Sequence, residues 1–179
     1  MGGYTGAARP GARRILAAAW LLAAVLLGAC DGHRIQALEE GVSTEADVRR
    51  QFGEPERIWP GPAGSRIFEY NRQPSGQRNY MIGIGPDGMM ASLRQVLTAE
   101  NFARIVPGLT ADEVRQRLGR PARVTPYALK NEITWDWRYF QPPNHAMVFS
   151  VTFGPDSRVL RTGSMVDPES EGDRSKPAG

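Results

Sequence analysis

The chain has 179 residues, of which 41% are hydrophobic, enough for one ordinary domain or two small ones. The single cysteine excludes an internal disulfide and a cysteine-based metal cluster, and two histidines leave little for a zinc site. The formal net charge is +3, but residues 1–29 hold three arginines and no acid, so the rest of the chain has 19 basic and 19 acidic residues. These basic residues are scattered among acids rather than gathered in a basic stripe, so nucleic acid is not expected as a partner.

The N-terminus has the pattern of a bacterial export signal. Arg13 and Arg14 precede an apolar run over residues 15–27, which is shorter than the roughly 20 apolar residues of a membrane-spanning helix. We therefore expect a leader over residues 1–29 rather than an uncleaved signal anchor.

The end of this leader, residues 27–30 (LGAC), resembles the lipobox of bacterial lipoproteins. The resemblance implies that cleavage falls between Ala29 and Cys30 and that Cys30 then carries the lipid. Acyl chains contribute about 0.8 kcal/mol for each buried CH₂, so several chains hold a protein stably on a membrane. The sequence thus predicts an extracytoplasmic protein that is bound to a membrane through the lipid on Cys30.

The body of the chain contains an internal repeat, because residues 44–55 (TEADVRRQFGEP) match residues 110–121 (TADEVRQRLGRP) at an offset of 66. Each copy predicts a short helix, with a threonine and an acid three residues later as a capping box and an apolar pair four residues apart on one face. Each ends at a glycine suited to a left-handed C-cap, followed by a proline that prevents continuation. The residues that carry this motif are Thr44, Val48, Phe52, Gly53 and Pro55 in the first copy, and Thr110, Val114, Leu118, Gly119 and Pro121 in the second.

Three further segments repeat at nearly the same spacing. A short amphipathic helix precedes each capped helix, a strand with alternating aromatic and acidic residues follows, and a Gly-Pro-Asp turn then separates two apolar runs. These segments are residues 35–38 and 102–105, residues 67–70 and 134–137, and residues 85–88 and 154–157.

These repeats predict an α+β fold of two tandem units, residues 30–97 and 98–163. Each is expected to be a helix pair packed on a three-stranded antiparallel sheet. Residues 164–179 are almost without apolar side chains, so we expect a disordered tail.

Residues 33–163 resemble the SmpA/OmlA (BamE-like) family of outer-membrane lipoproteins, on the basis of the lipobox and the capped helix with its Gly-x-Pro exit. The resemblance implies an accessory role in the assembly of outer-membrane β-barrel proteins, with the assembly machinery as partner. It also implies a location at the periplasmic face of the outer membrane. Asp31, directly after the cysteine, instead resembles a signal for retention at the inner membrane, so both membranes remain open.

Two such units in tandem are also similar to the architecture of the β-lactamase inhibitor proteins, which cover an enzyme with a concave sheet. This second resemblance implies an alternative function, that of an envelope binding or inhibitory module. Such a module would recognise another protein through the surface of its sheets.

An enzyme is not expected, because no nucleophile has a base at a suitable spacing and no metal-ligand cluster is present. His145 follows two prolines in a predicted loop and has no partner nearby in the sequence, which disfavours a lipid-anchored hydrolase. Residues 83–88 (GIGPDG) satisfy the dinucleotide-binding pattern G-x-G-x-x-G, but a strand rather than a helix is predicted after them. No cofactor and no metal are therefore expected.

An aromatic stripe lies in the predicted strand over residues 133–140, where alternation places Trp135, Trp137 and Tyr139, together with Ile133, on one face. Asp136 and Arg138 fall on the opposite face. We favour the interpretation that this face is core packed under the helices. The alternative is a protein interface, for which tryptophan and tyrosine are frequent anchors. The sequence alone leaves open which face of the sheet is exposed.

Overall fold

The computed structural model describes residues 37–172, and the described residues from Glu40 onward belong to one compact unit. The predicted leader, the lipid-attachment residue Cys30 and Asp31 lie outside the described residues.

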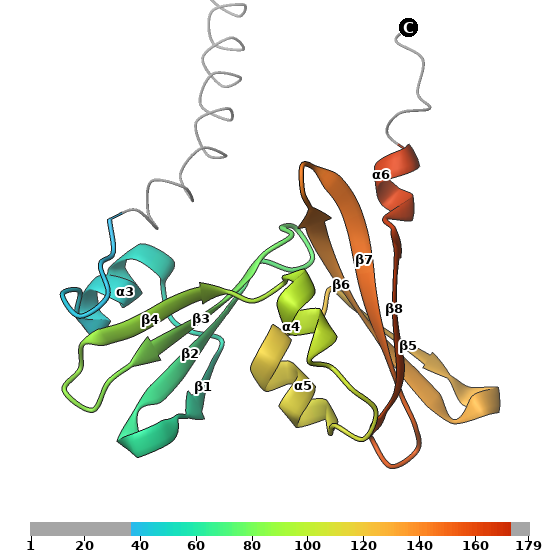
Figure 1. Cartoon of the computed structure of the whole chain (residues 1–179), viewed down its shortest axis with the longest axis horizontal. Helices are drawn as coiled ribbons and strands as arrows, with labels where there is room; N and C mark the ends of the chain where they lie inside the picture. Colours follow the sequence, from blue (N-terminus) through green and yellow to red (C-terminus); the bar gives the residue numbers. More distant parts are fainter. Residues whose placement is uncertain (1–36, 173–179) are drawn as a thin grey trace, which may run out of the picture. The chain divides into compact units, whose positions relative to one another are not determined.

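The first repeat consists of one capped helix and a four-stranded antiparallel sheet in the order β1-β2-β3-β4 (Figure 1). A single 3₁₀ turn, η1 (Pro62–Gly64), joins its first two strands. The elements are α3 (Glu45–Phe52), β1 (Arg57–Pro60), β2 (Arg66–Asn71), β3 (Asn79–Ile84) and β4 (Met90–Gln95).

The second repeat has the same order of elements with one more helix before and one after, and its sheet runs β5-β6-β7-β8 (Figure 1). The 3₁₀ turn between its first two strands is η2 (Ala128–Lys130). The elements are α4 (Ala99–Ala103), α5 (Ala111–Leu118), β5 (Arg123–Tyr127), β6 (Glu132–Gln141), β7 (His145–Phe153), β8 (Val159–Val166) and α6 (Pro168–Gly172).

The α+β class and the two sheet-based repeats are confirmed, but the three-stranded sheet is wrong because each sheet has a fourth strand. The missed strands are β1 and β5, which are short edge strands, largely exposed, and contain Pro60 and Pro126. Such strands lack the alternation of apolar and polar residues by which a strand is recognised in sequence.

The helix pair holds only for the second repeat, where α4 precedes α5, since residues 37–40 form no helix. The expected disordered tail is also wrong for residues 164–172. The boundary expected at residue 163 falls inside β8, which continues to Val166 and is followed by α6.

Both capping boxes are present. The Thr44 hydroxyl accepts from the Asp47 N–H at 3.2 Å, and the Asp47 carboxylate accepts from the Thr44 N–H at 2.9 Å. In the second copy Thr110 and Glu113 form the same pair of hydrogen bonds, at 3.3 and 2.8 Å. Each helix therefore begins at the residue that the sequence indicates.

Gly53 and Gly119 end the two helices, but not in the left-handed conformation that we expected. Their φ angles are +83° and +76° with ψ angles of −163° and −170°, a region that only glycine adopts readily. The Tyr70 hydroxyl donates to the Gly53 carbonyl oxygen at 3.0 Å, and the Trp137 indole Nε1 donates to the Gly119 carbonyl oxygen at 3.1 Å. Equivalent aromatic residues of β2 and β6 thus fix both helix exits. Burial raises the pKa of Tyr70 to about 12, which keeps its hydroxyl a donor.

The Gly-Pro-Asp turns connect the last two strands of each sheet, as expected. Each turn is also hydrogen-bonded to the first residue of the capped helix. Glu45 N–H donates to the Gly88 carbonyl oxygen at 2.9 Å, and Ala111 N–H donates to the Ser157 carbonyl oxygen at 3.0 Å. A strand follows the G-x-G-x-x-G segment, so this glycine pattern has no helix N-terminus to hold a pyrophosphate.

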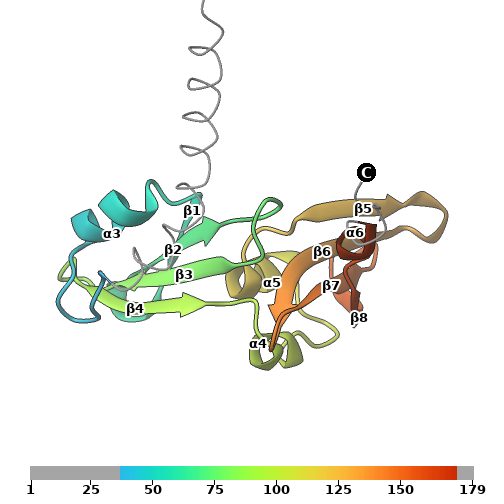
Figure 2. The same cartoon turned by 90° about the horizontal axis from the view of Figure 1, so that it is seen from above.

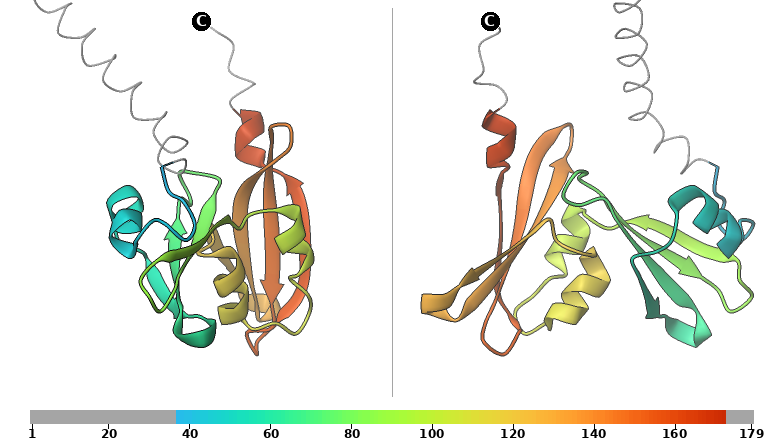
Figure 3. Two further views of the ribbon diagram at one scale, coloured as in Figure 1. Left: turned by 60° about the vertical axis from the view of Figure 1, so that its left-hand side comes forward. Right: turned by 180° about the vertical axis from the view of Figure 1, so that it is seen from behind.

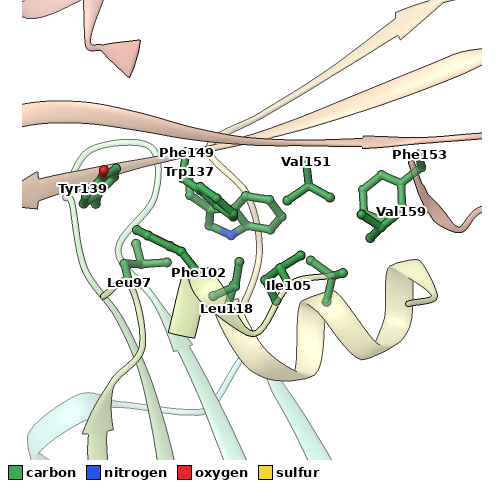
Figure 4. Close-up of a cluster of buried hydrophobic side chains, with 11 residues drawn as sticks. Leu97, Phe102, Ile105, Leu118, Trp137, Tyr139, Phe149, Val151, Phe153 and Val159 are labelled. Carbon is green, nitrogen blue, oxygen red and sulfur yellow. The ribbon is translucent and has the colours of Figure 1, made fainter. Parts of the chain in front are cut away.

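The aromatic stripe belongs to the core of the second repeat (Figure 4). Trp137 and Tyr139 are buried beneath α4 and α5, so the interface interpretation is wrong for these two residues and the core interpretation is confirmed. Trp135 is half-buried at the edge of the same cluster, with its ring 4.8 Å from that of Phe153.

A candidate protein-binding surface on the second sheet

The helix α5 separates the two sheets: one side of it packs on the core face of the second sheet and the other on the first sheet (Figure 3). The first sheet therefore has helices on both faces, α3 on one and α5 on the other. This arrangement decides which sheet surfaces remain accessible.

The contact between α5 and the first sheet is centred on Glu69, whose exposure is 0%. Its carboxylate accepts hydrogen bonds from Trp59 Nε1 at 2.9 Å, from Asn71 Nδ2 at 2.8 Å and from Arg115 Nε at 3.2 Å. A buried charge is tolerated only when it is paired and hydrogen-bonded, as it is here. Glu69 therefore has a structural role.

Further polar contacts complete this junction. Arg115 also pairs with Glu56 at 3.0 Å, and Arg120 reaches Glu56 at 3.3 Å. The Asn79 amide donates to the carbonyl oxygens of Leu118 and Arg120 at 2.8 and 3.0 Å. These hydrogen bonds and ion pairs join the first sheet to α5 and to the residues that follow it.

Among residues 37–172, no helix lies across the equivalent face of the second sheet as α5 does across the first. The strand register makes Asp136 the counterpart of Glu69, because Glu69 pairs with Arg57 and Met81 whereas Asp136 pairs with Arg123 and Ser150. We call this surface the open face, and its residues are Arg123, Thr125, Thr134, Asp136, Val148, Ser150 and Met165. Together with Tyr127 and Pro168, the first residue of α6, they surround a hollow of about 420 Å³.

Hydroxyl groups and ion pairs dominate the open face. Asp136 accepts from Ser150 Oγ at 2.6 Å and from Arg123 Nε at 3.1 Å. At its border, the Arg161 guanidinium binds both oxygens of Glu132, at 3.0 and 2.6 Å, and holds the pKa of that carboxyl below its ordinary value. These groups are satisfied within the chain, and α6 reaches only one end of the face.

Next to the open face lies the hairpin of β5 and β6 (Figure 2). Several of its apolar side chains are exposed. The exposed fractions are 53% for Val124, 50% for Tyr127 and 42% for Ile133, and Leu129 in η2 is fully exposed. We call these four residues the hairpin patch. Along the chain, Ile133 is the first residue of β6 that pairs with β7. Residues 127–132 come before this pairing and therefore extend past the rest of the sheet.

The register places Val124 and Ile133 on the Trp135 side of the hairpin and Tyr127 on the side of the open face, so the hairpin patch surrounds the tip of the hairpin. Exposed apolar side chains close together mark a site of interaction more often than single exposed residues do. Ile133 was part of the predicted stripe, but Val124, Tyr127 and Leu129 gave no signal in the sequence. They lie in a proline-containing edge strand and a turn, where exposure depends on how far α5 covers the sheet.

The other residues singled out in the sequence have structural or unassigned positions. The ten motif residues form the two helices and their exits. His145 is exposed at the start of β7. Within residues 37–172 no three His, Cys, Asp or Glu side chains are grouped so that they could hold a metal ion. None of the described helices is long and apolar enough to cross a membrane.

No family model matches the chain, and no curated protein matches it. Among solved structures, it is similar to a DUF4309 family protein (YjgB) from Bacillus subtilis subsp. subtilis strain 168. The identity is 24% over 74% of this chain and 84% of that one, with a TM-score of 0.29. It is also similar to a proposed beta-lactamase inhibitor protein from Streptococcus mutans, with 11% identity over 69% of this chain and 82% of that one and a TM-score of 0.32.

Neither of these two proteins is described as a member of the SmpA/OmlA family. At these TM-scores neither likeness assigns a function to this chain.

Proposed function

We propose that the protein is a lipid-anchored binding module of the bacterial cell envelope that recognises another protein through the second sheet. The observation that carries the proposal is the hairpin patch, four exposed apolar side chains on one projecting hairpin. Apolar anchors such as Tyr127 beside a rim of polar and charged groups have the composition of a protein interface. The open face, with its hydroxyls and its Arg123, supplies such a rim.

The lipid anchor in this proposal rests on the lipobox sequence alone, because Cys30 lies outside the described residues. A second candidate function, an accessory role in outer-membrane β-barrel assembly, has the duplicated capped helix as its support. The same binding surface serves both candidates, and the identity of the partner tells them apart.

The test is an affinity pull-down from membranes with the lipidated protein, comparing the variants Leu129→Asp and Ile133→Asp with Ile58→Asp. Ile58 is the matched control, because it lies in the corresponding hairpin of the first repeat and is 45% exposed. We expect both patch variants to lose the partner and Ile58→Asp to keep it. Equal recovery with all three variants would overturn the proposed surface.

The recovered partner decides between the two candidate functions. A single soluble envelope protein supports the binding or inhibitory module. Recovery of the β-barrel assembly machinery, together with lower levels of barrel proteins after deletion, supports the second candidate.

The anchor is tested separately with Cys30→Ser, which removes the sulfur atom that would be acylated. We expect the variant to take up no labelled fatty acid and to remain unprocessed. Labelling at the level of the unaltered protein would show that the lipobox interpretation is wrong. Density-gradient fractionation of the unaltered protein then assigns it to the inner or the outer membrane.

A further inference from the structure

A cleft of about 410 Å³ lies between the first sheet and the two helices of the second repeat, away from the hairpin patch. Its apolar lining includes Ile67 and Met81 on the sheet and Val96 just after β4. Met81 and Val96 are buried and Ile67 is half-buried. The volume falls within the range of small-molecule sites, roughly 300–1,000 Å³.

Three arginines line this cleft, Arg94 from β4, Arg104 after α4 and Arg117 from α5, and none of the lining residues is acidic. Within the described residues, the Arg94 side chain has no hydrogen bond or ion pair, although its backbone pairs with Met81 in the sheet. Arg117 donates only to the Glu113 carbonyl oxygen, at 2.9 Å. Arg104 pairs with Glu100 of its own helix at 2.6 Å, in an exposed pair of the kind that contributes little stability.

The other side of the same junction shows the opposite arrangement. There Arg115 and Arg120 are matched by the carboxylates of Glu56 and Glu69. The acids of the junction thus lie on one side of α5, and on the other side only Arg104 of the three cleft arginines has a carboxylate partner among the described residues, Glu100, which does not line the cleft. These exposed arginines line the same cleft as the apolar side chains of Ile67, Met81 and Val96.

Guanidinium groups match carboxylate and phosphate oxygens with two parallel hydrogen bonds. The amide of Gln116 and the hydroxyl of Ser92, which also line the cleft, add uncharged donors. An apolar floor favours a ligand that carries an apolar group beside its charge. We propose that this cleft binds a small organic anion with an apolar portion, independently of the protein partner.

The probe is phenyl phosphate, which has a charged and an apolar end, titrated calorimetrically into the full chain in a non-ionic detergent. Inorganic phosphate and benzyl alcohol, which have only one of the two features, are the comparison ligands. We expect saturable binding of one phenyl phosphate per chain, weaker binding of inorganic phosphate, and loss of affinity with added salt. Equal affinity for benzyl alcohol, or no saturable binding of phenyl phosphate, would overturn the proposal.

Arg94→Gln and Arg117→Gln test the residues themselves, with Arg78→Gln as the matched control. Arg78 is exposed, lies outside the cleft and has no side-chain partner among the described residues. We expect each cleft variant to weaken phenyl phosphate binding about tenfold and the control to leave it unchanged. Ser92→Glu, which places a carboxylate in the cleft, should abolish binding.

Thermal unfolding checks that all four variants remain folded, which is expected because the substituted arginines are exposed and hold no carboxylate of another element. The same affinity in Arg94→Gln, Arg117→Gln and Arg78→Gln would overturn the site. Such a result would leave the proposed protein-binding function untouched, since that function depends on a different surface.

Discussion

The two sheets have the same strand order, and each packs its own capped helix on one face. The face opposite that helix has a different environment in each sheet. In the first sheet this face is covered by α5, and Glu69 lies at the centre of the contact. In the second sheet the corresponding Asp136 lies on the open face, and hydroxyl residues occupy positions that are apolar in the first. Thr125, for example, stands where the first repeat has Trp59.

The comparison shows how a tandem repeat produces both a junction and a surface. The helix of a following unit covers the sheet of the preceding one, and the last unit has no follower within the described chain. Terminal repeats with a polar outer face are the usual consequence of such stacking. The open face and its neighbouring hairpin are therefore the part of the molecule that is available to a different protein.

The largest effect is expected from removing the buried carboxylate. Glu69→Ala removes one of the two carboxylates that pair with Arg115 and leaves the buried Trp59 Nε1 without an acceptor, and should lower the free energy of unfolding by about 3 kcal/mol. Asp136→Ala should cost about 1 kcal/mol, because Arg123 and Ser150 can turn to solvent. Chemical denaturation measures both, and equal losses would contradict the different environments of the two faces.

A smaller difference is expected at the two helix exits. Gly53→Ala should destabilise by about 1–3 kcal/mol through backbone strain alone, since a Cβ atom at Gly53 has no neighbour within 4 Å. Gly119→Ala should cost about 1 kcal/mol more, because its Cβ would press against Asn71 Oδ1 and Asn79 Nδ2 at the junction. We had expected the two glycines to be equivalent, and equal losses would show that the junction imposes no such constraint.

The smallest effect concerns the two capping boxes, which the repeats share. Hydrogen bonds from Thr44 lower the pKa of Asp47, and hydrogen bonds from Thr110 lower the pKa of Glu113. Since each folded-state pKa lies below its unfolded value, the carboxylates stabilise the fold above about pH 4 and this contribution is lost as the pH falls further. Asp47→Asn and Glu113→Gln should each flatten the acid limb of the pH–stability curve, to a similar degree. A marked difference between them would show that the repeats differ even in this local device.

Much of each repeat could be read from the sequence, because the signals are local. A capping box lies within four residues, and the glycine and proline that end each helix follow directly. The turn between the last two strands likewise depends on four consecutive residues. Because all these signals occur twice at nearly the same spacing, two tandem units could be predicted. The edge strands β1 and β5 were not predicted, because an edge strand is held by hydrogen bonds to one neighbouring strand and can form without an alternation of apolar and polar residues.

The sequence by itself determined the start and the end of both capped helices, the hairpin turns and the aromatic face that alternation separates from Asp136. Only the tertiary structure decided that α5 covers Glu69, whereas Asp136 is buried among its neighbours in the second sheet without such a helix across it. It also decided that a Cβ atom at Gly119 would meet two asparagines and one at Gly53 none, and that the hairpin patch lies beyond the cover of α5. The physical reason is the separation along the chain of the residues that interact. Capping and turn formation depend on neighbours a few residues apart, whereas burial of a sheet face depends on a helix that follows more than 40 residues later, as Arg115 follows Glu69 at a separation of 46.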